Sequence, residues 1–177
     1  DIRNSGSTIS GNNVALVAGR DIVNEARIVG GNGVTRLGET GGIAAADGLQ
    51  MAAGRDVTLA GSRLAAGGDA RVSAGRDVNV TTVTTGSSFH GYHLDEDITT
   101  HHGSSVVVGG NLQMTAGNDL TVAGSGVAAG GDATLAAGRN LSVTAVQDVF
   151  KQEIRGSSSN GLLGSSSSRR NEERVTS

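Results

Sequence analysis

Four histidines are the residues of this chain best suited to chemistry, because they all lie in one short polar stretch. His90 and His93 precede the acidic run at residues 95–97, and His101 and His102 follow it. Imidazoles and carboxylates on facing arms could bind zinc or a similar metal, and histidines could change charge near pH 6. On a β-strand, however, H-x-x-H directs its two rings to opposite faces. A solvated polar hairpin is therefore the favoured interpretation, and no metal or other cofactor is expected.

Two further patterns partly match functional sites. Gly67-Gly68-Asp69 and Gly130-Gly131-Asp132 share residues with the calcium-binding nonapeptide G-G-x-G-x-D, but the repeat here is about 21 residues rather than nine. The pairs Arg20-Asp21, Arg55-Asp56 and Arg76-Asp77 could form the acid–base cluster of a β-helical polysaccharide-cleaving enzyme. Stacked at a corner, they instead favour exposed ion-pair ladders. With so few aromatic residues to hold a sugar, no enzyme activity is expected.

Composition restricts the fold that could position these residues. Aromatic residues make up 2% of the 177 residues, there is no Trp, Pro or Cys, and there are 29 glycines. The core must therefore be narrow and built from stacked small side chains. A net charge of −3 gives no basic surface, so nucleic acid is not an expected partner. The chain begins at Asp1 without Met or a signal sequence, and we expect it to be part of a longer protein.

An internal duplication organises the chain. Residues 46–83 return 63 residues later as residues 109–146, with about 22 of 38 positions identical. Within each copy the tetrad A-G-[RN]-[DN] recurs at an interval of 21 residues, as from Ala53 to Ala74. The structural unit is therefore about 21 residues, and the 63-residue interval corresponds to three units.

Each unit has the periodicity of β-strands. In Asp56–Ala60, Arg63–Ala66 and Ala70–Ala74, apolar residues alternate with polar or small ones. Three short strands and three corners make one triangular coil, and stacked coils pair their backbones at a spacing of about 4.8 Å. At the corners we expect glycines with positive φ and aspartates bonded to their own turn. The corners are Gly61-Ser62, Gly67-Gly68-Asp69 and Gly75-Arg76-Asp77. The sequence thus predicts an all-β parallel β-helix.

Three segments contain residues that do not fit the 21-residue repeat. Residues 1–84 are expected to form coils with a polar insertion at residues 25–42, and residues 105–146 to form further coils. Residues 85–104 have β-prone arms around an acidic tip, which predicts a hairpin outside the helix. Residues 147–177 predict a second such hairpin around a Ser/Gly-rich tip.

The coil sequences also resemble a known family. The segments LAAGGDARVSAGRDVNV, VAAGGDATLAAGRNLSVTAVQD and GLLGSSSS are similar to the haemagglutinin repeats of filamentous haemagglutinins and related exoproteins of bacterial two-partner secretion. Those exoproteins include toxin-bearing effectors of contact-dependent growth inhibition. The resemblance covers nearly the whole chain. It implies a right-handed β-helical stalk that is secreted through an outer-membrane partner to the cell surface, with part of it held in the periplasm before deployment.

Specificity is expected in the hairpins rather than in the coils. The expected function is a structural stalk that serves adhesion and presents hairpins to a glycan, protein or membrane of a host or neighbouring cell. An alternative is a repeat region that aids toxin delivery across a target membrane. The candidate contact residues are Phe89, His90, Tyr92, His93, Phe150, Leu162 and Leu163.

Overall fold

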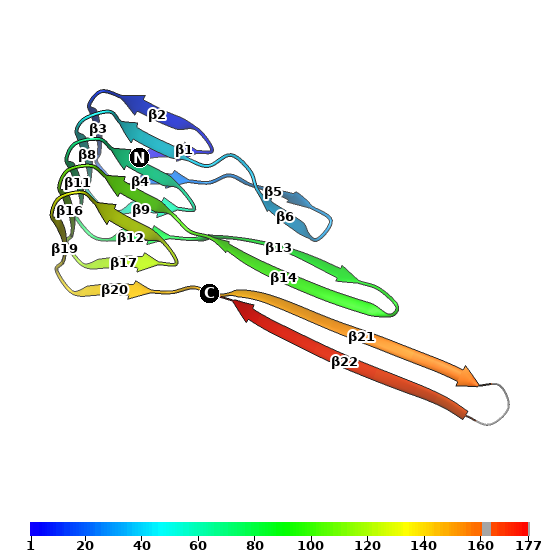
Figure 1. Ribbon diagram of the computed structural model, residues 1–177. Helices are drawn as coiled ribbons and strands as arrows, with labels where there is room; N and C mark the ends of the chain where they lie inside the picture. Colours follow the sequence, from blue (N-terminus) through cyan, green and yellow to red (C-terminus); the bar gives the residue numbers. More distant parts are fainter. Residues whose placement is uncertain (161–163, 177) are drawn as a thin grey trace.

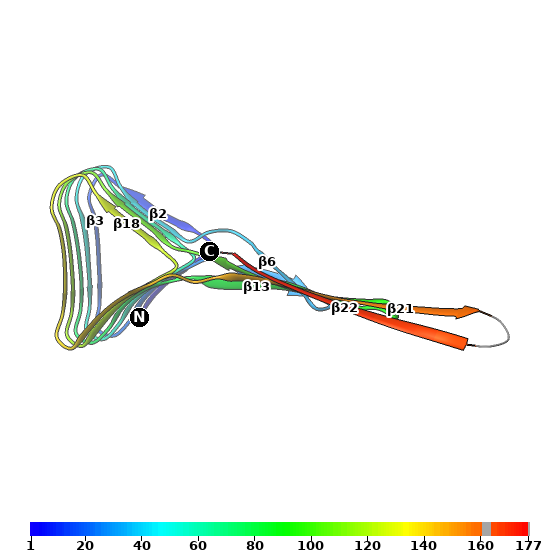
Figure 2. The ribbon, with the colours of Figure 1, turned by 60° about the horizontal axis from the view of Figure 1, so that its bottom comes forward.

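The computed structural model describes residues 1–160 and 164–176, in which the chain forms 22 β-strands and no helix. The strands make two bodies, a triangular rod of parallel sheets and a flat antiparallel sheet that leaves one corner of the rod (Figures 1 and 2). No helix in the described residues is long and apolar enough to cross a membrane. The predicted parallel β-helix is confirmed.

Three parallel sheets, A, B and C, form the sides of the rod, and each coil adds one strand to each sheet. Sheet A contains β1 (Ile2–Ser5), β4 (Ile22–Glu25), β9 (Val57–Ala60), β12 (Val78–Thr81), β17 (Asp119–Ala123) and β20 (Asn140–Thr144). Sheet B contains β2 (Thr8–Gly11), β7 (Gly42–Ala45), β10 (Arg63–Ala66), β15 (Ser105–Val108) and β18 (Gly126–Ala129). Sheet C contains β3 (Val14–Ala18), β8 (Leu49–Ala53), β11 (Ala70–Ala74), β16 (Leu112–Ala116) and β19 (Ala133–Ala137). The rod thus has five complete coils and the first strand of a sixth.

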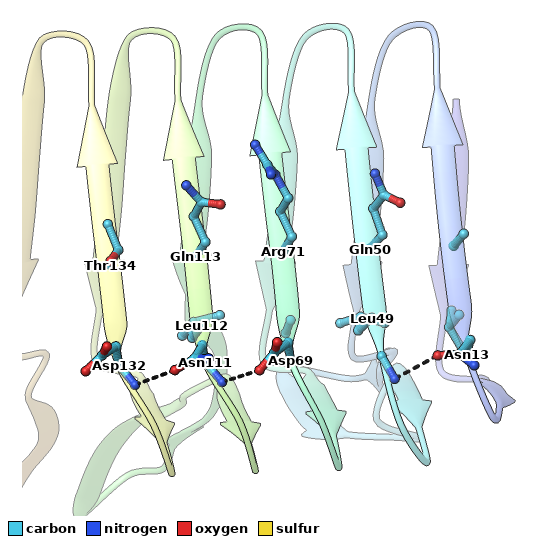
Figure 3. Close-up of a pocket in the computed structure, with 14 residues that line it drawn as sticks. Asn13, Leu49, Gln50, Asp69, Arg71, Asn111, Leu112, Gln113, Asp132 and Thr134 are labelled. Carbon is cyan, nitrogen blue, oxygen red and sulfur yellow. Dashed lines mark hydrogen bonds between the residues drawn. The ribbon is translucent and has the colours of Figure 1, made fainter.

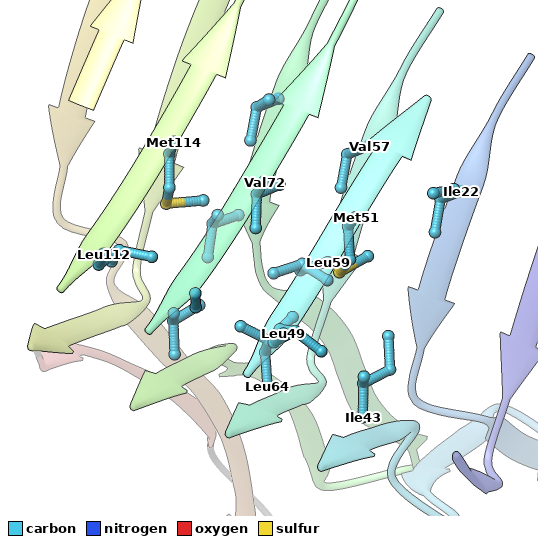
Figure 4. Close-up of a cluster of buried hydrophobic side chains, with 14 of the residues drawn as sticks. Ile22, Ile43, Leu49, Met51, Val57, Leu59, Leu64, Val72, Leu112 and Met114 are labelled. Atoms are coloured by element: carbon cyan, nitrogen blue, oxygen red, sulfur yellow. The ribbon is translucent and has the colours of Figure 1, made fainter. Parts of the chain in front are cut away.

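A narrow core fills the rod, as the composition requires. The inward side chains stack in register from coil to coil, so that Met51 lies beside Val72 and Val72 beside Met114 (Figure 4). Val57 and Leu64, which point inward from the other two sheets, are also fully buried. Each stack removes apolar surface from water along its whole length, and this burial is the main stabilising contribution to such a fold.

The corner glycines differ from the prediction. Among the predicted corners, only Gly61 has a positive φ, of 55°. At Gly75 the constraint is a close approach, because a Cβ there would lie 2.3 Å from the carbonyl oxygen of Gly54 in the adjacent coil. The expectation of positive φ at every corner was therefore wrong. The coils stack so closely at the other corners that a side chain would strike the neighbouring backbone.

The corner aspartates also bond differently from the prediction. The backbone N–H that Asp56 Oδ1 accepts, at 3.3 Å, belongs to Asp77 in the next coil and not to its own turn. The same carboxylate binds the guanidinium of Arg76, and Asp21 binds Arg55 in the same way, with an Oδ1–Nε distance of 2.8 Å. These contacts are the ion-pair ladder that the sequence favoured. They lower the pKa of Asp21 and raise that of Arg55.

A second polar ladder follows the outer edge of sheet C. There Asn111 N–H donates to Asp69 Oδ1 at 2.7 Å, and Asp132 N–H donates to Asn111 Oδ1 at 2.9 Å (Figure 3). The ladder borders an open groove of about 650 Å³ on the outside of the sheet. Its side chains satisfy corner N–H groups that the strands leave unpaired, so this ladder has a structural role.

Candidate interaction surface

Three hairpins leave the rod at one corner, always between sheet A and sheet B. They consist of β5 (Ile28–Gly31) with β6 (Val34–Leu37), β13 (Val83–His90) with β14 (Leu94–His102), and β21 (Asp148–Asn160) with β22 (Gly164–Thr176). Together they form one six-stranded antiparallel sheet in the order β22-β21-β14-β13-β6-β5, which we call the fin. Figure 2 shows it projecting as a single layer.

The hairpins alternate with tight corners along the rod. Coils that lack a hairpin turn from sheet A to sheet B through a Gly-Ser pair whose glycine has a positive φ, namely Gly6, Gly61 and Gly124. Hairpins therefore occur on every second coil. Each hairpin contributes two strands in the space of two coils, and both bodies have the strand spacing of about 4.8 Å that backbone pairing sets. Neighbouring hairpins are thus brought to pairing distance without a gap.

Adjacent hairpins are joined by backbone and side-chain bonds. The first and second hairpins meet at Val34 and Ser87, where Gly86 N–H also donates to Thr35 Oγ1 at 2.8 Å. The second and third pair over six positions, residues 94–99 of β14 with residues 149–154 of β21. The insertion expected at residues 25–42 therefore contains a hairpin, β5–β6, that belongs to the same sheet. The sequence signal for this hairpin is Asn32-Gly33 between β-prone residues, which is a strong hairpin signal.

One face of the fin, which we call the apolar face, carries five large hydrophobic side chains of the second and third hairpins, around the polar pair of Glu96 and Gln152. Ile98 lies opposite Phe150, and Leu94 lies opposite Ile154. Phe89 projects on the same face, since its partner Glu96 is two residues from both Leu94 and Ile98. Phe89 is 60% exposed and Ile154 42% exposed, while the other three are half-buried among their neighbours. In the described part of the chain, no other strand covers this face (Figure 2).

The opposite face, which we call the charged face, carries a network of ion pairs. Arg155 Nε donates to Glu153 Oε1 at 2.7 Å, and its Nη2 binds Asp95 on the neighbouring hairpin. Arg169 Nε lies 2.9 Å from the same Glu153 oxygen. The hydrogen bond from Arg155 lowers the pKa of Glu153, and that of Arg155 is raised in return. The network joins the second hairpin to the third by charge as well as by backbone bonds.

The four histidines are dispersed along the second hairpin. His90 lies on the charged face, and His93 lies in the turn, where its Nδ1 is 3.1 Å from the carbonyl oxygen of Arg155. At the root of the fin, His101 contacts Asp148 and the Nε2 of His102 is 2.8 Å from Thr85 Oγ1. In the described residues, no three metal-ligating side chains come together.

The predicted contact residues fall in different places. Phe89 and Phe150 share the apolar face, whereas His90 lies on the charged face. Tyr92 is 86% exposed in the turn, with its ring edge-on to that of His93 at 4.6 Å between centroids. Leu162 and Leu163 lie outside the described residues. As contacts, all seven stay predictions.

Sequence reasoning missed part of this surface. Leu94, Ile98 and Ile154 extend the apolar face, and their alternation with charged residues along two arms was the available signal. Their assignment to one face depends on which arms pair and in which register. Pairing between separate hairpins is not encoded in any local stretch of the chain.

A model of one known protein family matches most of the chain. The model of the hemagglutinin repeat family matches residues 29–92 and residues 81–161, which together run from residue 29 to residue 161 and cover about three quarters of the chain. Both matches include hairpin residues as well as coil residues. No solved structure was found to match the chain.

A curated relative supports the same assignment. The chain is 30% identical over 95 residues to a protein of Yersinia mollaretii named tRNA nuclease CdiA. The aligned part is 50% of this chain but 3% of that protein, so the chain spans a small fraction of its relative. With three quarters of its length matched by the family model, the chain belongs to the hemagglutinin repeat family.

Proposed function

We propose that this chain is a stalk segment of a secreted or surface-exposed bacterial exoprotein, and that it holds a sheet of hairpins in position to bind the surface of another cell. The observation that supports this most strongly is the fin. Three hairpins separated in the sequence are fused into one sheet at one corner of a rigid rod. A loop alone would have no fixed geometry, whereas the rod fixes the direction and the spacing of every hairpin.

The apolar face is the part of the fin that we propose makes contact. Phe89 and Phe150 lie on one face with Leu94, Ile98 and Ile154, in a single layer without a strand above it. An exposed cluster of this kind marks an interaction site more often than a single exposed side chain does. The partner we propose is a glycan, protein or membrane of a host or neighbouring cell. Export through an outer-membrane secretion partner belongs to the same proposal.

A binding experiment with fluorescent beads tests this function. Beads coated with the chain should adhere to target cells, and beads coated with Phe89→Ser/Phe150→Ser should adhere much less. The control is Asp97→Ser/Lys151→Ser, which changes the opposite face of the same two hairpins. Equal adhesion of both variants and the unmodified chain would rule out the apolar face as the contact. Circular dichroism melting must show that all three are folded.

A second candidate is a role in toxin delivery across a target-cell membrane. It is favoured by the relative named tRNA nuclease CdiA, since a nuclease that acts on tRNA needs a route into a cell. In this role the apolar face would enter the lipid interface. Flotation with phosphatidylethanolamine–phosphatidylglycerol liposomes tests this candidate. Absence of flotation by a chain that adheres to cells would count against delivery and would leave adhesion to a glycan or protein. Co-flotation that the Phe89→Ser/Phe150→Ser variant loses is the result that delivery requires.

The proposal includes no catalysis. The Arg-Asp pairs that could have acted as an acid–base cluster are engaged with each other: Arg55 binds Asp21, and Arg76 binds Asp56, along a solvent-exposed corner. Charges held in such a ladder support a structural role for these residues.

A further inference from the structure

The last strand of the fin has an open edge. The two edge strands of the fin are β5, which has four residues, and β22, which has 13. Among the described residues, β22 pairs with β21 on one side and with no strand on the other. A strand edge presents unpaired N–H and C=O groups that can accept another strand. Charged side chains of one sign would block a second identical edge, so the charges along β22 decide what it can accept.

The charges of β22 are complementary to themselves. Arg169 and Arg170 precede Asn171, and Glu172 and Glu173 follow it. When two copies of this strand pair antiparallel with Asn171 opposite Asn171, each residue faces the one at equal distance on the other side of the centre. Arg170 then faces Glu172 of the second copy and Arg169 faces Glu173, which by symmetry gives four opposite-charge pairs and no like-charge pair. Opposite charges directly across two strands stabilise their pairing.

These charges are available for such pairing. Within the chain, Arg170 lies opposite Ile154 and Glu172 opposite Gln152, and neither has an ion pair among the described residues. Both point to the apolar face, and paired residues of an antiparallel sheet share a face, so they would meet on the same side of a joined sheet.

The two charges on the opposite face already have partners. Arg169 lies 2.9 Å from Glu153, and Glu173 lies 3.5 Å from Lys151. The side chains of Arg169 and Glu173 are each more than half exposed. A pair between Arg169 of one copy and Glu173 of the second copy would connect the ion pairs of the two fins.

We propose that β22 pairs antiparallel with β22 of a second copy of this chain, about a twofold axis through Asn171. The two six-stranded fins then form one continuous sheet, with apolar face beside apolar face. A twofold axis normal to the sheet places the two rods at opposite ends of the strands and pointing in opposite directions. This interface does not depend on what the apolar face binds, and it is independent of the proposed function.

Charge exchange tests the pairing. In sedimentation velocity the unmodified chain should form a dimer that weakens with salt. The variant Glu172→Arg/Glu173→Arg makes every charged residue of the edge basic, and Arg169→Glu/Arg170→Glu makes the four charged residues at 169–173 acidic. Arg174 is unchanged in both variants and would face Ser168 of the second copy. Each variant alone should dimerise about tenfold or more weakly, and a mixture of the two should form a heterodimer. A monomeric wild-type chain, or a mixture that fails to associate, would overturn the proposal.

A cysteine tests the register, since the chain has no cysteine of its own. Two Asn171→Cys side chains would face each other across the axis within disulfide range and should cross-link on mild oxidation. The control is Glu172→Cys, whose two copies would be offset diagonally and should cross-link far less. Equal cross-linking of both variants, or a dimer that all charge variants retain, would indicate association through the open ends of the coils and would contradict the proposal.

Discussion

The rod and the fin are both built from paired β-strands, yet they are stabilised in different ways. Rod strands such as β11 pair on both edges in parallel and bury one face completely, with Val72 fully inaccessible to solvent. Fin strands such as β21 pair antiparallel, and Phe150 is only half-buried on a sheet that no second layer covers among residues 1–160 and 164–176. The rod therefore contributes the stability, and the fin has side chains free for recognition because it does not need them for a core.

The largest effect should come from charging the core of the rod. Val72→Asp places an unpaired carboxylate in the middle of a stack between Met51 and Met114, and should destabilise the fold by more than about 3 kcal/mol. Phe150→Asp, on the fin, should change stability far less. Urea unfolding followed by circular dichroism compares the two. Similar losses for both would mean that the fin, too, depends on a buried core.

A corner of the rod should be nearly as sensitive. Gly75→Ala places a Cβ 2.3 Å from the carbonyl oxygen of Gly54, so the coils must separate locally, at a cost of about 1–3 kcal/mol. Gly126→Ala is the matched control, because nothing lies within 4 Å of its added Cβ. The same urea titration should show a change within about 0.5 kcal/mol for the control. Tolerance of both substitutions would contradict the close stacking described for this corner.

Removing a hairpin should leave the rod intact. Replacing residues 82–103 by one glycine recreates the Gly-Ser corner with Ser104, whose hydroxyl already donates to Thr81 and accepts from the N–H of Ser62. The rod should keep its circular dichroism spectrum. Among residues 149–154, the amide hydrogens that are bonded to β14 should exchange about tenfold faster or more. Unchanged exchange would show that the third hairpin is stable alone.

The smallest effect should be the acid sensitivity of the corner ladder. The pKa of Asp21 is lower in the folded chain than the ordinary aspartate value of 3.8, chiefly through the hydrogen bond from Arg55. Its contribution to stability is therefore present at pH values above 3.8 and is lost as the pH falls through the folded pKa.

Melting temperatures recorded from pH 7 to pH 2 test this contribution. Asp21→Asn should melt slightly below the unmodified chain at neutral pH, and the difference should vanish in acid. Asp97→Asn, a fin carboxylate without an ion pair among the described residues, is the control. A difference that persists at pH 2 would contradict the assigned role of the ionised carboxylate.

The rod could be predicted from the sequence because its information is local. The alternation of apolar and polar residues in a stretch such as Ala70–Ala74 identifies the side chains that point inward. The 21-residue repeat from Gly54 to Gly75 identifies which residues stack on one another. The two departures, at the corner glycines and aspartates, both arise from contacts with the adjacent coil. A single coil considered alone gives no sign of the distance to its neighbour.

The fin could be predicted only in part. The hairpin β13–β14 follows from its own arms and turn, but the pairing of Ile98 with Phe150 joins residues 52 positions apart (150 − 98). Such pairing depends on where the rod releases each hairpin. The 63-residue interval was assigned to three equal units, and the structure resolves it into two coils and one hairpin.

The alternation of Gly-Ser corners with hairpins limits how such a molecule can change its length during evolution. Gain or loss of a single coil would shift the next hairpin by one strand position and leave a vacancy or a collision in the fin. A pair of coils together with its hairpin restores both bodies at once. The duplicated segment at residues 46–83 and 109–146 is offset by this composite module of 63 residues. If the gene grows by whole modules, the stacking of coils in the rod and the pairing of hairpin strands in the fin are both preserved.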